Sequence, residues 1–172
     1  MGSDITVGCD NGIVNLRVGA IIMKDGKFLM AGNERADYLY SVGGRIKFGE
    51  TSEDAVVREV FEETGVKLEV DRLGFIEENF FYGDATTNLG TLIYEISFFY
   101  YMKVPEDFEP VCYSFTEDAS KEYLKWVSPD EEMVMFPRFF RTELKNPQQG
   151  VKHFITDDRE SSIQRINTGA AE

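Results

Sequence analysis

Several residue types that mark particular protein classes are scarce in this sequence of 172 residues. The two cysteines, Cys9 and Cys112, lie far apart and lack metal-ligand spacing, and His153 is the single histidine. No apolar run approaches the roughly 18 residues that a membrane-spanning helix needs. Residues 1–4 carry neither the basic start nor the apolar stretch of a secretory signal. We therefore expect a cytoplasmic protein.

Basic residues are also in short supply. Eighteen lysines and arginines stand against 31 acidic residues, and the formal net charge is −13. Nucleic-acid polymers and anionic lipid surfaces are normally bound by basic surfaces, so this balance argues against both as partners. A small anionic substrate would need a local reversal of the field, which a bound divalent cation would supply.

The length and the hydrophobic share of 42% indicate one soluble domain with its own core. We expect this domain over residues 1–160 and a flexible C-terminal tail over residues 161–172. The predicted strands cover residues 16–23, 28–30, 38–42, 66–70, 74–81, 92–102, 123–127 and 151–155, and the predicted helices cover residues 52–64, 129–135 and 138–144. Because strands and helices interleave without a regular βαβ order, the pattern indicates an α+β fold with helices packed on a mixed sheet.

The clearest helix is the one over residues 52–64. Thr51 and Asp54 have the spacing of a capping box at its start, and Gly65 suits the left-handed position after its end. The side of this helix predicted to be buried consists of the apolar positions Val57, Val60 and Phe61. These boundaries define the helix on which the chemistry of the chain is expected.

Three glutamates, Glu59, Glu62 and Glu63, fall within an arc of roughly 100° on this helix. A solvated acidic face is the ordinary interpretation of such a cluster. However, like charges three and four residues apart cost a few tenths of a kcal/mol each, and the last turn of a helix disfavours acids by roughly 0.3–1 kcal/mol. Carboxylates without a basic partner are what a hard divalent cation such as Mg²⁺ binds, so a metal site is the functional interpretation.

The spacing around these glutamates is specific. Residues 44–66 read GRIKFGE, seven further residues, and REVFEETGV. This segment resembles the Nudix box, the loop–helix–loop motif of Nudix hydrolases, at every fixed position. The resemblance implies the Nudix fold, a mixed β-sheet sandwiched between helices (α/β/α), over roughly residues 12–157. It also implies a hydrolase that cleaves the diphosphate linkage of a nucleoside diphosphate joined to another moiety; a non-catalytic nucleotide-sensing module of the same fold is the alternative.

The resemblance also implies roles for individual residues. The metal ligands for Mg²⁺ or Mn²⁺ would be Glu59, Glu62, Glu63 and the carbonyl of Gly44, and one of the three glutamates would act as the base on the attacking water. The catalytic set would also include Arg58 and Glu50, which would form a pair that ties the loop to the helix. An ordinary surface ion pair is the alternative for these two residues.

Residues outside the motif complete the prediction. Glu122 is the first choice for a further acidic ligand and Glu117 the second, with plain solvated acids as the alternative. Glu95 interrupts an apolar strand and faces either a substrate cavity or the solvated side of the sheet. The basic residues placed to meet phosphate oxygens are Arg17, Arg35, Arg45 and Lys47.

Aromatic residues are plentiful. Tyr82 lies near the position where some relatives that cleave diadenosine polyphosphates carry a tyrosine. A base-stacking pocket is one interpretation of the aromatics; a core or the interface of a homodimer is the other. For His153, a position on an outer strand stands against a phosphate contact.

Overall fold

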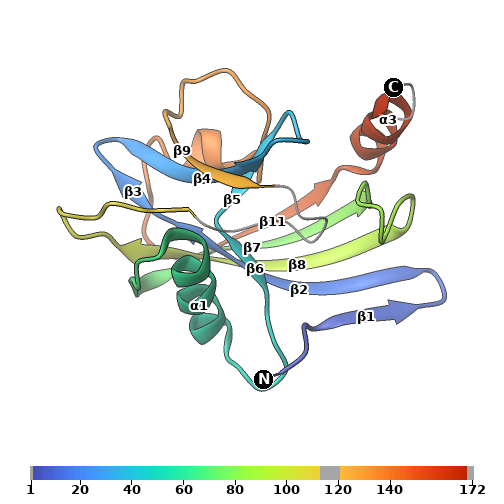
Figure 1. The fold of residues 1–172 in the computed structure, drawn as a ribbon, viewed down its shortest axis with the longest axis horizontal. Coiled ribbons are helices and arrows are strands. Elements are labelled where there is room, and N and C mark those ends of the chain that lie inside the picture. Colours follow the sequence, from blue (N-terminus) through green and yellow to red (C-terminus); the bar gives the residue numbers. More distant parts are fainter. Residues whose placement is uncertain (1, 113–120, 170–172) are drawn as a thin grey trace.

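The computed structural model describes residues 2–112 and 121–169 (Figure 1). Its strands are β1 (Thr6–Cys9), β2 (Gly12–Ile21), β3 (Met23–Lys24), β4 (Lys27–Asn33), β5 (Leu39–Ser41), β6 (Gly43–Arg45), β7 (Glu69–Tyr82), β8 (Leu92–Lys103), β9 (Glu122–Val127), β10 (Met135–Phe136) and β11 (Lys152–Asp157). Its helices are α1 (Ser52–Thr64), α2 (Phe140–Glu143) and α3 (Arg159–Gly169).

The strands form two sheets. One has the order β1-β2-β8-β7-β11, with β6 also paired to β2, and the other has the order β10-β5-β4-β3, with β9 also paired to β4. Strand β2 runs parallel to β8 and antiparallel to β6, so the first sheet is mixed. This arrangement confirms the predicted α+β class.

Alternate residues of the central strands enter two different cores. Val18 and Ala20 of β2 pack with α1 in one hydrophobic cluster, whereas Ile21 joins a second cluster that contains Phe140 of α2. Because successive side chains of a strand point to opposite faces, these clusters cover the two faces of the larger sheet. The sheet is therefore sandwiched between helices, as the resemblance implies.

Helix α1 has the predicted ends. The Thr51 hydroxyl accepts a hydrogen bond from the backbone N–H of Asp54, and Gly65 adopts a φ of 70°. Its buried face differs from the prediction, because Phe61 is 54% exposed whereas Ala55, Val56 and Val60 are fully buried. Val56 and Val60 lie four residues apart and define the inward direction of the helix, so Phe61, one residue further on, is rotated by about 100° away from it.

Three other segments differ from the sequence-based expectation. One continuous strand, β7, replaces the two predicted strands over residues 66–81 and absorbs its irregularity as two register shifts against β8. Residues 129–135 are not helical, because the chain there pairs with β5 through a hydrogen bond from Leu39 N–H to the carbonyl of Val134. The pattern of apolar and polar residues within one segment does not show which distant segment it will pair with.

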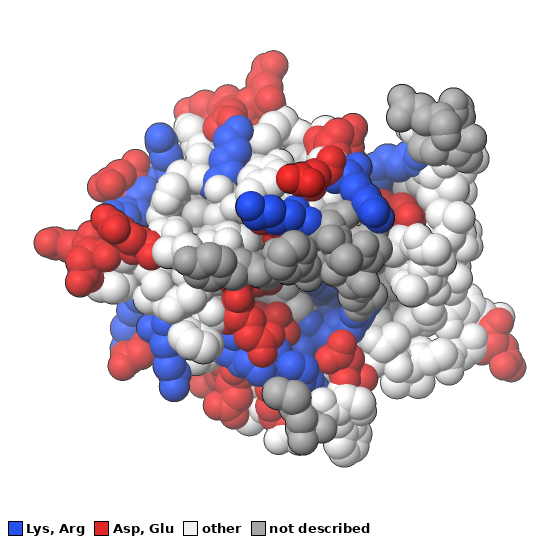
Figure 2. Space-filling view, in the orientation of Figure 1, with Lys and Arg blue, Asp and Glu red and all other residues white. Residues whose placement is uncertain are grey.

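The third difference is the C-terminal segment. It forms helix α3 instead of the predicted tail, because the fully buried Ser162 accepts a hydrogen bond from Tyr82 N–H and attaches the helix to β7. None of the helices among residues 2–112 and 121–169 is long and apolar enough to cross a membrane. On the face shown in Figure 2, basic side chains lie among acidic ones. The electrostatic potential at any point of this face therefore depends on the charged residues nearest to it, and not only on the net charge.

Candidate active site

A double glycine at the start of β6 faces the end of helix α1. Gly43 has a φ of 146°, and its N–H donates to Oε1 of Glu63 over 3.0 Å. A Cβ added to Gly44 would lie 2.5 Å from Cδ of Glu59, so a larger residue would displace that carboxylate. Glycine therefore permits the backbone and two acidic side chains to approach closely.

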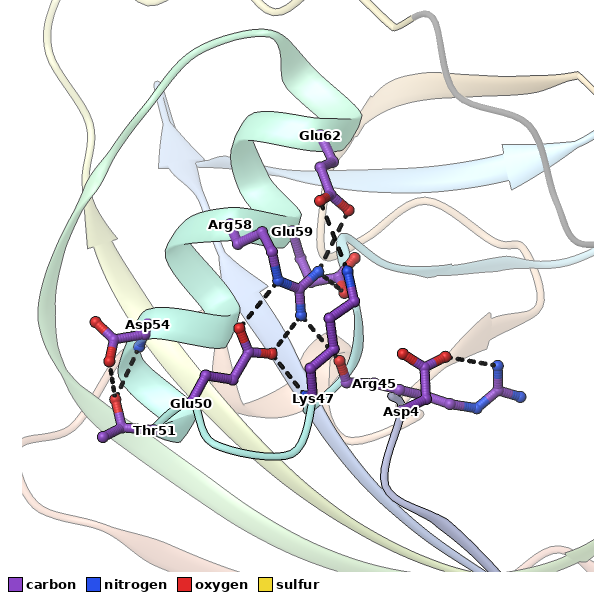
Figure 3. Close-up of polar contacts among 9 residues, drawn as sticks. All are labelled: Asp4, Arg45, Lys47, Glu50, Thr51, Asp54, Arg58, Glu59 and Glu62. Carbon is purple, nitrogen blue, oxygen red and sulfur yellow. Dashed lines mark hydrogen bonds and ion pairs between the residues drawn. The ribbon is translucent and has the colours of Figure 1, made fainter. Parts of the chain in front are cut away.

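Arg58 ties the loop before α1 to the helix (Figure 3). Its Nε and Nη2 donate to the two carboxylate oxygens of Glu50 over 3.1 and 2.6 Å, and Nη2 also donates to the carbonyl of Arg45 over 3.0 Å. Both side chains are 19% exposed, which distinguishes this pair from an ordinary surface pair. The hydrogen bonds from Arg58 hold the pKa of Glu50 below its ordinary value.

The same guanidinium contacts two of the glutamates. Nη1 of Arg58 donates to Oε1 of Glu59 over 2.5 Å and to Oε2 of Glu62 over 3.3 Å, and Lys47 lies 3.9 Å from Glu62. The expectation that these carboxylates have no basic partner is therefore wrong. Arginine can serve several acceptors at once because its planar group carries five N–H donors.

The three glutamates differ in burial. Glu63 is 7% exposed, the Glu59 side chain 13% and the Glu62 side chain 46%. Burial raises the pKa of Glu63 well above its ordinary value, and Glu122 and Glu59 add to this against the hydrogen bond from Gly43. Burial also raises the pKa of Glu59, against the opposing effect of Arg58. Desolvation, more than crowding, therefore makes these carboxylates costly to ionise.

These residues fit a hard divalent cation. Oε2 of Glu63 is buried and has no hydrogen-bond partner, and every acidic group nearby offers only oxygen ligands. Within the described residues, no three acidic, histidine or cysteine side chains already converge on one metal position. A cation would therefore replace Arg58 as the partner of Glu59 and Glu62.

Glu122 lies beside this group at the start of β9. Its Oε1 accepts a hydrogen bond of 2.5 Å from the hydroxyl of Tyr40, and its charge raises the pKa of Glu63. The structure therefore brings Glu122 to the glutamates of α1, where the further acidic ligand was expected. Glu117 lies outside the described residues.

Arg17 lies on β2 of the larger sheet, close enough to Glu59 and Glu63 for its charge to act on them. It lies opposite Arg45 in β6 and opposite Ser97 in β8, and its Nε is 3.9 Å from Oε2 of Glu95. Burial raises the pKa of Glu59 and Glu63, and the charge of Arg17 opposes this rise. Arg45 extends its Nη1 to within 3.8 Å of Asp4. Arg17 and Glu95 thus lie together beside the candidate metal ligands.

Other predicted contacts lie further away. Arg35 is exposed in the loop after β4, and its N–H donates to the side chain of Asn33, which lies opposite Glu122. Tyr82 is five residues along β7 from Glu77, the position level with Ser97, so the structure places it about 16 Å from the level of Arg17. His153 is exposed on the edge strand β11 and contacts Glu78 at 2.9 Å.

Sequence reasoning missed a buried acid near this site. Glu77 of β7 is buried, accepts a hydrogen bond of 2.7 Å from Thr156, and lies opposite Ser97 in the register. Burial raises the pKa of Glu77 to about 7, with a further contribution from Glu95. The sequence feature that could have identified Glu77 is an acidic residue within an apolar strand, the same feature that singled out Glu95.

Comparison with known proteins defines the family. The model of the NUDIX domain matches residues 15–146, and the chain belongs to this family. A MutT-like protein from Streptomyces ambofaciens is 36% identical over 61 residues, which are 36% of this chain and 40% of that protein. The aligned stretch thus spans less than half of that relative.

Solved structures agree on the fold. A MutT NUDIX hydrolase from Burkholderia pseudomallei has a TM-score of 0.55 at 23% identity and covers 78% of this chain and 98% of its own. An ADP-ribose pyrophosphatase from Streptococcus suis has a TM-score of 0.52 at 16% identity and covers 81% and 98%, respectively. Because both structures are less than 25% identical to this chain, the similarity shows a shared fold and nothing about the substrate.

Proposed function

We propose that this protein is a Mg²⁺- or Mn²⁺-dependent pyrophosphohydrolase. Its substrate would be a small nucleoside diphosphate joined to another moiety, and water would attack a phosphorus atom of the diphosphate. The observation that carries the proposal is the buried carboxylate of Glu63, which has one oxygen without a partner next to the close contact of Glu59 with Gly44. Membership of the NUDIX family supports the reaction class.

The ligand set proposed for the cation consists of Glu59, Glu62, Glu63, Glu122 and the carbonyl of Gly44. When bound, the cation offsets phosphate charge and lowers the pKa of the attacking water. One of the three helix glutamates takes the proton from that water. The loop bound to Arg58 through Glu50 holds the N-terminal half of the helix in place, so the ligands remain aligned.

Substrate contacts are proposed for the basic residues nearby. Arg17 and Arg45 would bind phosphate oxygens, and Glu95 would orient Arg17 from behind. Arg35 would contact the substrate from the rim. Tyr82 would meet only the distal end of a long substrate, because it lies about 16 Å along the sheet.

A substrate panel tests this proposal. The protein is incubated with nucleotide sugars, dinucleoside polyphosphates, ADP-ribose and nucleoside triphosphates, with Mg²⁺ or Mn²⁺, and phosphorylated products are measured. We expect turnover of at least one of these compounds and its loss when the metal is chelated. Nucleotide binding without products across the whole panel would contradict the proposal and favour a sensing module.

A matched pair of variants links turnover to the glutamates. We expect Glu62→Gln to lower kcat by about a hundredfold or more, the range for loss of a catalytic carboxylate, while the fold is retained because the side chain is largely exposed. Glu53→Gln, in the exposed first turn of the same helix, is the control and should keep full turnover. Full activity of Glu62→Gln would contradict the ligand assignment.

A further inference from the structure

The hydroxyl of Tyr40 is hydrogen-bonded to a carboxylate beside the proposed cation site. The Oδ1 atom of Asn33 accepts from the backbone N–H groups of Arg35 and Ala36, both over 2.9 Å. Burial and the Glu122 carboxylate raise the pKa of Tyr40, and the amide of Asn33 nearby opposes this rise. The hydroxyl of Tyr40 donates to Oε1 of Glu122 over 2.5 Å.

The strand register explains why these residues meet. Asn33, the last residue of β4, lies opposite Glu122 of β9. Ala31, two residues earlier, lies opposite Tyr40 of β5. Tyr40 therefore reaches Glu122 diagonally across β4, and side chains from three adjacent strands end at one point. Hydrogen bonds across a sheet hold all three backbones, so the position of the hydroxyl is well determined.

On the other side, Glu122 is close enough to Glu63 for the two charges to interact. Glu63 is 7% exposed, and while Gly43 N–H binds its Oε1, its buried Oε2 has no partner. Each of these carboxylates thus has one oxygen held by a protein donor. A divalent cation bound between these two acids would offset both charges and give the buried Oε2 of Glu63 a partner.

We propose that Tyr40 is a positioning residue for the cation site, whose hydroxyl holds the Glu122 carboxylate toward Glu63 so that both can bind one divalent ion. This inference rests on the proposed function. Ligating carboxylates are commonly held by a second layer of hydrogen bonds, and loss of such a bond typically costs 10–100-fold in metal affinity or activity. Without the hydroxyl, the Glu122 side chain is free to turn toward water.

Manganese binding to the full chain, measured by calorimetry at neutral pH, tests this role. We expect Tyr40→Phe to weaken Mn²⁺ binding by about 10–100-fold, because the ring is retained and only the hydroxyl is lost. The matched control is Tyr38→Phe, which removes a hydroxyl from the same segment, where it bonds Asp84 at 3.3 Å. This control should bind Mn²⁺ as the wild type does.

A double variant shows whether Tyr40 acts through Glu122. Glu122→Gln alone should weaken Mn²⁺ binding, and adding Tyr40→Phe should weaken it little further, because the two changes interrupt one interaction. A purely structural role would lower the thermal midpoint of Tyr40→Phe but leave the Mn²⁺ affinity of the folded protein unchanged. Melting curves recorded on the same samples separate these cases.

Three results would overturn the inference: wild-type Mn²⁺ affinity in Tyr40→Phe, wild-type affinity in Glu122→Gln, or fully additive losses in the double variant. Each leaves the proposed reaction standing, provided that the wild-type protein binds Mn²⁺ and turns over a substrate; the second would also remove Glu122 from the proposed ligand set. Failure of the wild-type protein to bind Mn²⁺ at all would instead remove the proposed function, and this inference with it.

Discussion

Replacement of Arg58 by lysine is the sharpest test of how the loop is held on helix α1. Arg58 donates to four groups, which are the carboxylates of Glu50, Glu59 and Glu62 and the carbonyl of Arg45. Lysine keeps the charge but lacks the planar fork that reaches several acceptors at once. The substitution therefore isolates geometry from charge.

The expected magnitude follows from the contacts. An ammonium group at this position can replace the bond to one oxygen of Glu50, and at least two other bonds to Glu50 and Arg45 are lost. A hydrogen bond that involves a charged group contributes about 1.5–3 kcal/mol, and partial exposure of the pair reduces this. We expect Arg58→Lys to lower the free energy of unfolding by about 2–4 kcal/mol.

Arg159 offers a matched control. Its Nε and Nη2 bind the two oxygens of Asp157 over 2.8 and 2.6 Å, which is the same two-point geometry, but both side chains are 51% exposed. An exposed pair contributes under about 1 kcal/mol, so Arg159→Lys should have little effect. Urea unfolding in the presence of a chelator, followed by circular dichroism, gives both values. Equal losses in the two variants would refute the reasoning.

Two further predictions concern the glycine contact and a buried acid. Gly44→Ala should weaken Mn²⁺ binding at least tenfold in calorimetry, because the added Cβ would collide with Glu59. The control Gly8→Ala, which has open space around it, should bind Mn²⁺ as the wild type does. Equal affinities of the two variants would contradict the role given to Gly44. Burial raises the pKa of Glu77 from 4.5 to about 7 on folding. The stability that Glu77 contributes is therefore complete below pH 4.5 and is lost as the pH rises through 7. The contribution of Glu77 to the free energy of unfolding should therefore fall by about 3 kcal/mol across that window in urea titrations. Glu77→Gln should reduce the fall in stability by about this amount, whereas the exposed control Glu69→Gln should leave it as in the wild type. A fall in Glu77→Gln as large as that of the wild type would contradict the contribution of Glu77.

The ends of helix α1 could be predicted from the sequence because they depend on residues close together in the chain. The capping pair Thr51 and Asp54 and the terminal Gly65 act within a few residues of one another, so the ends of helix α1 could be read directly. The pairing of Arg58 with Glu50 was implied by the resemblance to the Nudix box, which places Glu50 just before helix α1 and Arg58 within it. These contacts need little knowledge of the rest of the chain.

Contacts between distant segments could not be predicted in this way. The additional bonds of Arg58 to Glu59 and Glu62 depend on where the guanidinium lies once Glu50 has bound it. The meeting of Tyr40 with Glu122 depends on the order of three strands, which no local pattern specifies.

The same reasoning applies to the secondary structure that was assigned wrongly. Residues 129–135 carry a good helix-start signal, but pairing of β10 with β5 buries Met135 and outweighs it. The C-terminal helix has a polar sequence, and contacts with distant segments attach it: Ser162 accepts from Tyr82 N–H, and Arg165 lies 3.9 Å from Asp84. In both cases tertiary contacts decide against a weak local preference.

The pairing of Arg58 with the acids of its own helix has a consequence for the order of assembly. The guanidinium of Arg58 already neutralises part of the charge of Glu59 and Glu62, so we expect the chain to fold before any metal ion binds. This contrasts with small zinc domains, in which binding and folding are one event. Under the proposed function, chelation should abolish turnover reversibly without unfolding the protein, and an arriving ion would compete with the guanidinium of Arg58 for Glu59 and Glu62.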